Sequence, residues 1–280
     1  MKRLYITDLD GTLFRNNARL SPRCAAALNT LIEQGAWISV ASARSPIGVS
    51  LTNLNEVRFR LPLVLMNGAI LYDLAAGRIL DSFYWEPETA GAVLEICRRG
   101  GKTPFLYRVE EGRMDIVFTQ LTSEGEREFY RKRAERFPGV FRKEAAYPLS
   151  GGVYCSMQDA EEVLRPIQEQ LSRLPEVDSV LYADTYREDN WYLEIFSARA
   201  GKANGVRRLR ERLGAQAVTA FGDNDNDIAM LEQADTACVV ANGSARAKEK
   251  ADILLPSNEE DGVAEYILAD YAPDGKDGTL

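Results

Sequence analysis

The sequence predicts an α/β protein. A parallel-sheet core domain is expected over residues 1–78 and 197–280, and a smaller α+β domain, residues 79–196, is inserted into it. In the first and last parts of the chain, nearly continuous apolar runs alternate with helical patterns, which is typical of parallel strands buried on both faces. The middle part carries more charge and is interrupted by glycine pairs at 100–101 and 151–152.

Each element of the first part has a local signal. Strands are predicted at residues 4–7, 37–41 and 61–66, where the apolar runs lie. Helices are predicted to begin at Ser21-Pro22 and at Ser45-Pro46. Serine caps the free N–H groups of a first turn, and proline fits the first helical position.

The remaining elements follow from the same patterns. The inserted domain is expected to hold two helices and a mostly antiparallel sheet, with helices near 88–99 and 159–174 and strands near 105–107, 114–119, 152–157, 177–182 and 191–195. In the last part we expect helices at 202–213, 227–234, 244–251 and 262–271, alternating with strands at 217–221, 238–241 and 253–255.

Composition excludes several classes of function. The 280-residue chain has 34 Lys and Arg against 42 Asp and Glu, a net charge of −8, so a general nucleic-acid binder is not expected. It has no histidine, which excludes histidine-based triads and histidine-ligated zinc. The four cysteines show no C-x-x-C spacing and are expected to be buried thiols. The longest apolar stretch, residues 61–72, is too short to span a bilayer, so we expect a cytoplasmic protein without a membrane partner.

Polar side chains follow the predicted core strands where each strand ends. Asp8 and Asp10 follow the first strand, Ser42 the second, Asn67 the third, and residues 222–227 the strand at 217–221. Ligands of open parallel sheets bind at the carboxyl ends of the strands, so these groups are expected to meet there. Lys202 stands at the start of the next predicted helix and is expected at the same edge.

The chemistry of these groups suggests phosphoryl transfer. A carboxylate such as Asp8 can act as a nucleophile on phosphorus, but it is repelled by a phosphate dianion. A divalent cation bridging Asp8, Asp223 and a phosphoryl oxygen would cancel that repulsion, and oxygen ligands favour Mg²⁺. Asp10 suits general acid–base work. Ser42 and Lys202 can bind the phosphoryl oxygens.

Two other motifs are rejected. The run at residues 223–227 looks like half of an EF-hand, but Ile228 and Ala234 stand where glycine and glutamate are required. Gly101-Lys102-Thr103 mimics the end of a P-loop, but Ile96 occupies the position of the first glycine.

Together these residues resemble the haloacid-dehalogenase-like phosphohydrolases, most closely their Cof-type subfamily. The first motif, Asp-x-Asp-Gly-Thr, matches residues 8–12, and the second motif matches Ser42, followed by Ala43-Arg44. The third motif lysine matches Lys202, and the fourth, Gly-Asp-x-x-Asn-Asp, matches residues 222–227. One departure is Ser244, which stands where the subfamily usually has asparagine.

The resemblance implies a Rossmann-like core with an α/β cap that sets substrate specificity. It also implies a Mg²⁺-dependent phosphatase that acts on small phosphorylated metabolites through an aspartyl phosphate. The expected catalytic residues are Asp8, the nucleophile, and Asp10, the acid/base. The expected metal ligands are Asp8, Asp10, Asp223 and Asp227, and the expected phosphate-binding residues are Ser42, Lys202, Gly11 and Asn226. Candidate substrate contacts are Arg44, Asn67, Tyr186, Arg187, Asn190 and Glu194.

Two alternatives stay open at this point. A phosphotransferase or phosphomutase would use the same core residues, including Asp10. A non-catalytic regulator that binds a phosphorylated ligand is also possible in principle, although the intact acids at Asp8, Asp10 and Asp223 count against it. The sequence gives neither the substrate nor the oligomeric state.

Overall fold

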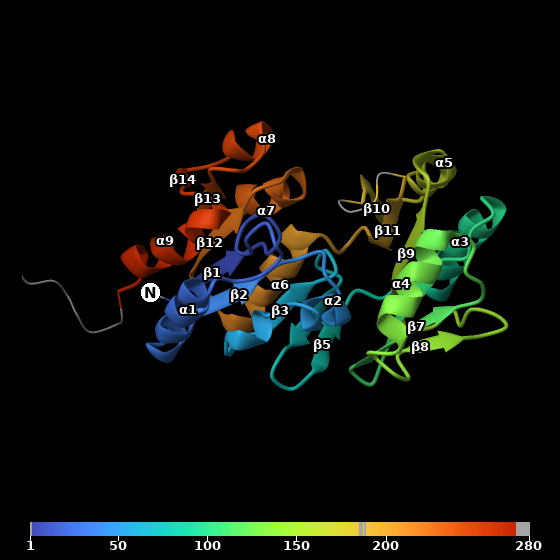
Figure 1. Cartoon of the computed structure of the whole chain (residues 1–280), viewed down its shortest axis with the longest axis horizontal. Helices are drawn as coiled ribbons and strands as arrows, with labels where there is room; N and C mark the ends of the chain where they lie inside the picture. The colour runs from blue at the N-terminus through green and yellow to red at the C-terminus, as the bar shows by residue number, and fades with distance from the viewer. Residues whose placement is uncertain (1, 185–186, 188, 273–280) are drawn as a thin grey trace, which may run out of the picture. The chain divides into compact units, whose positions relative to one another are not determined.

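The computed structural model describes residues 2–184, 187 and 189–272 (Figure 1). The chain divides into two compact units. One comprises Met1–Leu80 together with Gly201–Leu280, and the other comprises Asp81–Ala200. The first unit is therefore built from two segments that are separated by a 120-residue insertion.

The first unit is built on a five-stranded parallel sheet with the order β14-β13-β12-β1-β2. Its strands are β1 (Arg3–Thr7), β2 (Trp37–Val40), β12 (Ala217–Gly222), β13 (Thr236–Val240) and β14 (Ile253–Leu255). β1 lies between β2 and β12, so the two segments of the unit meet in the middle of one sheet. The predicted α/β fold class is confirmed.

Helices cover both faces of this sheet, because side chains of successive strand residues point to opposite sides. The helices are α1 (Pro22–Glu33), α2 (Pro46–Ser50), α6 (Lys202–Leu213), α7 (Ile228–Glu232), α8 (Ala245–Lys248) and α9 (Gly262–Asp270), with 3₁₀ turns η1 (Leu54–Glu56), η2 (Asp225–Asp227) and η3 (Asn258–Glu260). Ile6 of β1 belongs to the same buried cluster as Val206 of α6 and Met230 of α7. On the other face, the Tyr5 hydroxyl donates to Asp270 of α9 at 2.7 Å.

The predicted helix starts are confirmed by their caps. The Ser21 Oγ accepts a hydrogen bond from Cys24 N at 2.9 Å, and the Ser45 Oγ accepts one from Gly48 N at 3.2 Å. These serines satisfy N–H groups that have no partner within the helix.

The segment that follows α2 differs from the prediction. β3 (Leu63–Leu65) continues the parallel sheet only through an isolated bridge between Ala41 and Val64. It pairs instead in an antiparallel sheet of its own, β3-β4-β5, with β4 (Ile70–Asp73) and β5 (Arg78–Ser82). β4 was hidden in the long apolar stretch of residues 61–72, which periodicity could not divide.

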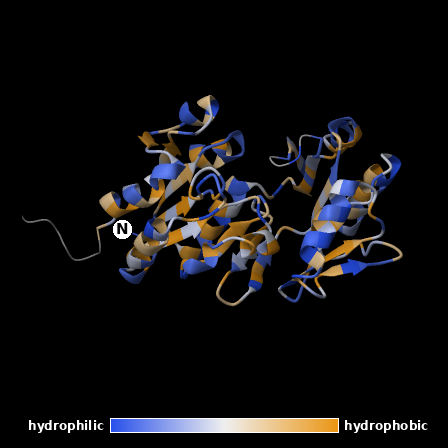
Figure 2. Cartoon of the chain, in the orientation of Figure 1, coloured by the Kyte–Doolittle hydropathy of each residue, from blue (hydrophilic) through white to orange (hydrophobic). Residues whose placement is uncertain are grey.

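The second unit contains a six-stranded sheet with the order β10-β11-β9-β6-β7-β8, in which β7 and β8 are parallel and the other pairs antiparallel. Its strands are β6 (Phe105–Glu110), β7 (Arg113–Phe118), β8 (Phe141–Lys143), β9 (Gly152–Asp159), β10 (Val177–Ala183) and β11 (Trp191–Ser197). Helices α3 (Pro87–Arg99) and α5 (Glu161–Leu171) pack on one face, where Val93 and Leu164 join a buried cluster with Cys155. The strands of both units are largely hydrophobic in Figure 2.

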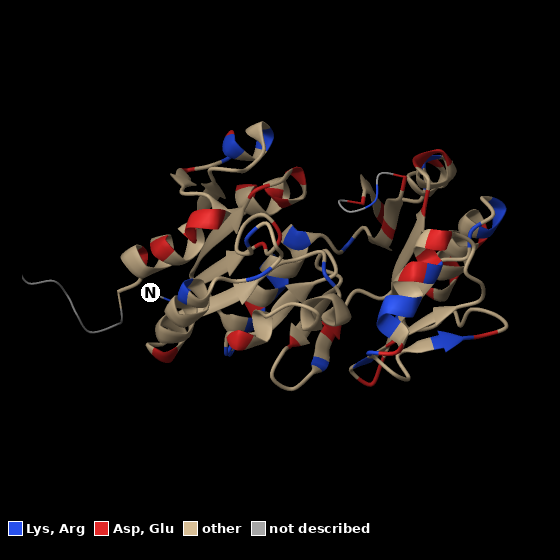
Figure 3. Ribbon diagram, viewed as in Figure 1, with Lys and Arg blue, Asp and Glu red and all other residues tan. Residues whose placement is uncertain are grey.

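Helix α4 (Glu124–Ala134) and strand β8 were not predicted. α4 packs on the other face of the sheet, where the ring of Phe129 lies 5.1 Å from that of Phe105. Its exposed side carries many charges of both signs (Figure 3). α4 contains too few apolar residues to show a clear helical period in the sequence.

The cysteines agree with the prediction, since Cys24, Cys97, Cys155 and Cys238 are all buried and free of disulfides. Burial raises the pKa of Cys24, Cys97 and Cys238 to about 12. In the part of the chain that the structure describes, no helix is long and apolar enough to cross a membrane.

Candidate active site

A buried lysine joins two of the predicted aspartates. Lys202 is the first residue of α6, and its Nζ donates to Asp8 Oδ1 at 2.6 Å and to Asp227 Oδ1 at 2.7 Å. The side chains of Lys202, Asp8 and Asp227 are 2%, 8% and 0% exposed. Because Asp8 follows β1 and Asp227 follows β12, the adjacency of these two strands brings residues far apart in sequence into contact.

Asp223 completes the acidic group. Carboxylate oxygens of Asp8, Asp223 and Asp227 all lie within 4.8 Å of one another. Asp223 is held by Thr12, whose Oγ1 donates to Asp223 Oδ1 at 2.6 Å. Asp227 also fixes the loop, because its Oδ2 accepts from the backbone N–H groups of Asp223 and Asn224 at 3.1 Å each.

The pKa values of these side chains reflect an excess of carboxylates over positive charges. Burial, together with the charges of Asp227 and Asp223, raises the pKa of Asp8 well above its usual range, although Lys202 opposes the shift. Burial likewise raises the pKa of Asp223 to about 6. Burial alone would lower the pKa of Lys202, but Asp227 and Asp8 outweigh it and raise the pKa. Three carboxylates thus share a single ammonium group.

The donor set fits a hard divalent cation. Three carboxylates that approach one another closely and lie largely out of water are unfavourable without a counter-charge, and a single lysine supplies only part of it. Oxygen donors of this kind suit Mg²⁺, Mn²⁺ or Ca²⁺ better than a soft metal. The acidic cluster is therefore able to hold a metal ion.

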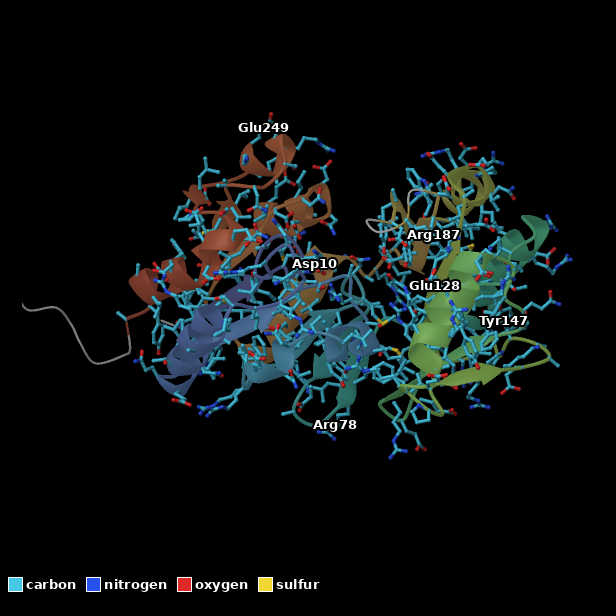
Figure 4. The ribbon with its side chains drawn as sticks, viewed as in Figure 1. Asp10, Arg78, Glu128, Tyr147, Arg187 and Glu249 are labelled. Carbon is cyan, nitrogen blue, oxygen red and sulfur yellow. The ribbon has the colours of Figure 1, made fainter. Side chains whose placement is uncertain are left out.

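Asp10 lies apart from this cluster and has a different partner. Its carboxylate accepts two hydrogen bonds from Arg44, from Nε to Oδ2 and from Nη2 to Oδ1, both at 2.6 Å. The Asp10 side chain, which comes from the loop that follows β1 and is labelled in Figure 4, is 49% exposed. The predicted acid/base residue is thus paired with Arg44, a predicted substrate contact.

The other three predicted phosphate-binding residues come from three different segments of the chain. Ser42 is buried, and its Oγ accepts from Arg44 N at 3.2 Å. Gly11 forms a turn with a φ of +83°, and its carbonyl oxygen accepts from Asn242 Nδ2 at 2.7 Å. Asn226 is exposed in η2.

Asn67 lies against the start of α6. Its carbonyl oxygen accepts from Gly201 N at 2.7 Å, one residue before Lys202. Residues 66–68 all have positive φ, and a Cβ on Gly68 would collide with the Gly201 carbonyl oxygen. This close approach requires glycine, and it fixes the backbone from which Lys202 projects.

The candidates in the second unit have local partners. Arg187 Nη1 lies 3.3 Å from Glu128 Oε2, and both residues are labelled in Figure 4. Asn190 is buried and donates to Asp184 Oδ2 at 3.0 Å, while Glu194 accepts from the Tyr182 hydroxyl at 2.9 Å. Tyr186 lies outside the described residues. That these residues contact substrate stays a prediction.

Sequence reasoning assigned no role to several residues that support the site. Thr12 belongs to the first motif, so the motif itself was the available signal. Ser244 caps α8 by accepting from Ala247 N at 3.1 Å, donates through Oγ to Asp225 Oδ1 at 3.1 Å, and donates through its backbone N–H to the Asp223 carbonyl at 2.7 Å. Asn242 connects the first motif to η3, because its Oδ1 accepts from Asn258 N at 3.0 Å.

This fold and this acidic site define a class of hydrolases. The model of the haloacid dehalogenase-like hydrolase family matches residues 5–267, and the chain belongs to that family. The resemblance stated from the four motifs is confirmed, and with it the prediction of an enzyme of the hydrolase class.

Particular relatives resemble the chain over nearly its whole length. It is 23% identical to a 5-amino-6-(5-phospho-D-ribitylamino)uracil phosphatase of Bacillus subtilis, covering 94% of this chain and 96% of that protein. It is 25% identical to a pyridoxal phosphate phosphatase of Escherichia coli, covering 95% and 98%. Among solved structures, a haloacid dehalogenase-like hydrolase from Bacteroides thetaiotaomicron superposes with a TM-score of 0.76 at 23% identity, covering 97% and 100%.

Proposed function

We propose that this protein is a Mg²⁺-dependent phosphatase that hydrolyses small phosphorylated metabolites through an aspartyl phosphate on Asp8. The observation that carries the proposal is the buried contact of Lys202 with Asp8 and Asp227, with Asp223 beside them. The two relatives described above, named as phosphatases of phosphorylated small molecules, support the same reaction class.

Each residue has a role in this scheme. Asp8 attacks phosphorus, and Lys202 both orients the Asp8 carboxylate and offers positive charge to the phosphoryl oxygens. Asp8, Asp223 and Asp227 would hold the metal, with the backbone carbonyl of Asp10 as the further predicted ligand, which leaves the Asp10 carboxyl group for proton transfer. A bound Mg²⁺ supplies the charge that offsets repulsion between the phosphate dianion and the carboxylates.

The proposed reaction has two steps. In the first, a bond forms between an Asp8 oxygen and phosphorus while the bond from phosphorus to the leaving oxygen breaks, and Asp10 gives that oxygen a proton. In the second, Asp10 takes a proton from a water molecule that attacks phosphorus, and the bond to Asp8 breaks. Inorganic phosphate and the free Asp8 carboxylate result, and Asp10 again carries the proton with which it began. Ser42 and Asn226 are proposed to bind the phosphate, and Gly11 to offer it backbone contact.

The inserted unit, residues 81–200, is proposed to select the substrate. The family resemblance supports this division of labour, and Arg187 and Asn190 are the residues of that unit we would test first. Hydrolysis of a small ester such as p-nitrophenyl phosphate should depend less on substrate selection by this unit than hydrolysis of a larger metabolite does.

The decisive test is the Asp8→Asn variant assayed with p-nitrophenyl phosphate and Mg²⁺. Phosphate release should be abolished while circular dichroism shows an intact fold, because the amide keeps the shape of the side chain and loses the nucleophile. EDTA should abolish phosphate release by the wild type. Asp252→Asn is the matched control, since this carboxylate of the same unit accepts a backbone N–H from Ala237 away from the site. Wild-type turnover in Asp8→Asn would refute the mechanism.

A further inference from the structure

The carboxylate of Asp10 is held in one orientation by Arg44. The two hydrogen bonds, both at 2.6 Å, form a fork in which each guanidinium N–H group meets a different oxygen. Such a bidentate pair fixes rotation about the last bond of the aspartate, which a single contact does not. Each oxygen keeps a further lone pair for a proton or a water molecule.

Arg44 is itself held in place on several sides. Its guanidinium carbon lies 5.7 Å from the centre of the buried Phe14 ring, and its Nη1 donates to the Gly48 carbonyl oxygen at 3.4 Å. Its backbone N–H donates to Ser42 Oγ. These contacts fix the guanidinium group of Arg44, in the loop between β2 and α2, with two of its N–H groups directed at Asp10.

We propose that Arg44 is a positioning residue that orients Asp10 for proton transfer, and that alkyl phosphate monoesters are the substrate class that needs it. This inference rests on the proposed function. As the bond between phosphorus and the leaving oxygen breaks, its electron pair stays on that oxygen, which takes the proton of Asp10 while an Asp8 oxygen bonds to phosphorus. An alkoxide is a poor leaving group without that proton, whereas a nitrophenolate leaves without it.

The test compares Arg44→Met and Arg44→Lys with the wild type on a series of esters, from alkyl phosphates through phenyl phosphate to 2,4-dinitrophenyl phosphate. The quantity measured is kcat/KM, which covers the steps up to departure of the leaving group. Arg44→Met should lower it about 100-fold for alkyl esters, the cost of a misplaced catalytic group. For the dinitrophenyl ester it should fall less than about 3-fold, because little general-acid help is required. Arg44→Lys should fall between, since a lysine offers charge without the fork.

Two further variants separate positioning from other roles. Arg15→Met is the matched control, because Arg15 also pairs with a carboxylate, that of Asp261, outside the acid–base pair. It should lower kcat/KM equally or not at all across the series. In an Asp10→Asn background, Arg44→Met should add no further dependence on the leaving group, because the residue acts through Asp10.

The outcomes are distinct. A wild type that hydrolyses none of the esters overturns the proposed function, and the inference falls with it. A wild type that is active, with Arg44→Met slowing every ester by the same factor, leaves the function standing and overturns the inference. A dependence on the leaving group that appears in Arg44→Met and disappears in the Asp10→Asn background supports it.

Discussion

Gly11 and Asp223 approach so closely that a Cβ on residue 11 would stand 2.6 Å from Asp223 Oδ2. The contact joins the loop after β1 to the loop after β12, and the φ of +83° at Gly11 is itself unfavourable for other residues. No side chain fits between the turn and the carboxylate without moving the acidic group.

We therefore expect Gly11→Ala to lower kcat/KM for p-nitrophenyl phosphate by roughly 100-fold, the cost of a displacement of about 1 Å. Gly139→Ala separates this effect from backbone strain, because Gly139 has a φ of +82° and no neighbouring atom within 4 Å of an added Cβ. The control should lose about 1 kcal/mol of unfolding free energy and keep its activity. Equal activity losses in the two variants would contradict this explanation.

Lys202 and Lys102 form a natural comparison, because each side chain is 2% exposed and contacts two carboxylates. Removing either lysine leaves at least one buried carboxylate without its cation, so Lys202→Met and Lys102→Met should each lower the unfolding free energy by about 3–5 kcal/mol in EDTA. Only Lys202→Met should also lose roughly 10²–10³-fold in kcat per folded molecule. Urea titration and turnover of p-nitrophenyl phosphate measure the two effects. Full turnover in Lys202→Met would show that this lysine is structural as well.

The pKa of about 6 at Asp223 predicts how the metal-free protein responds to pH. The folded state binds this proton more tightly than the unfolded chain, so the resulting stability is fully present below about pH 4 and is lost as pH rises through 6. A metal must displace this proton, and that of Asp8 as well, so Mg²⁺ affinity should weaken by about tenfold or more for each unit below pH 6. Titration calorimetry at pH 5, 6 and 7.5 measures this slope. A flat response that Asp223→Asn does not change would exclude Asp223 as a ligand.

The departure at Ser244 gives a prediction about stability. Ser244→Ala removes the cap of α8 and the contact with Asp225, and it should cost about 1 kcal/mol. Ser244→Asn restores the residue that the Cof-type subfamily usually has, and it should keep the cap because asparagine caps helices as well as serine does. Thermal unfolding of the three proteins measures the difference. A Ser244→Asn variant as unstable as Ser244→Ala would show that capping of α8 does not account for the stability that Ser244 contributes.

The closeness of Asp8 to Asp223 and Asp227 could be anticipated because it depends on topology. Parallel strands end at the same edge of a sheet, so residues that follow β1 and β12 are neighbours whatever lies between them in the sequence. The cap residues of α1 and α2 were equally predictable, since Ser-Pro carries its own local signal.

The pairing of Arg44 with Asp10 could not be predicted in this way. A long side chain chooses among many rotamers, and its partner depends on packing, here against Phe14, which the linear order does not reveal. Helix α4 was missed because its apolar residues are few, although Ser123 and Glu126 form a capping box that marks its start. The burial of Lys102 against Glu126 had no signal in the sequence, where Lys102 was considered only as part of a rejected P-loop motif.

The position of β1 between β2 and β12 affects how the chain folds during its synthesis. β1 and its neighbour β12 are far apart in the chain, because β12 is made more than 200 residues after β1. The central pairing must wait through translation of the whole insertion, and such long-range closure makes folding slow. Meanwhile the inserted unit, whose strands are continuous in sequence, can fold first, and the apolar edge of β1 that will pair with β12 stays uncovered until β12 has been made.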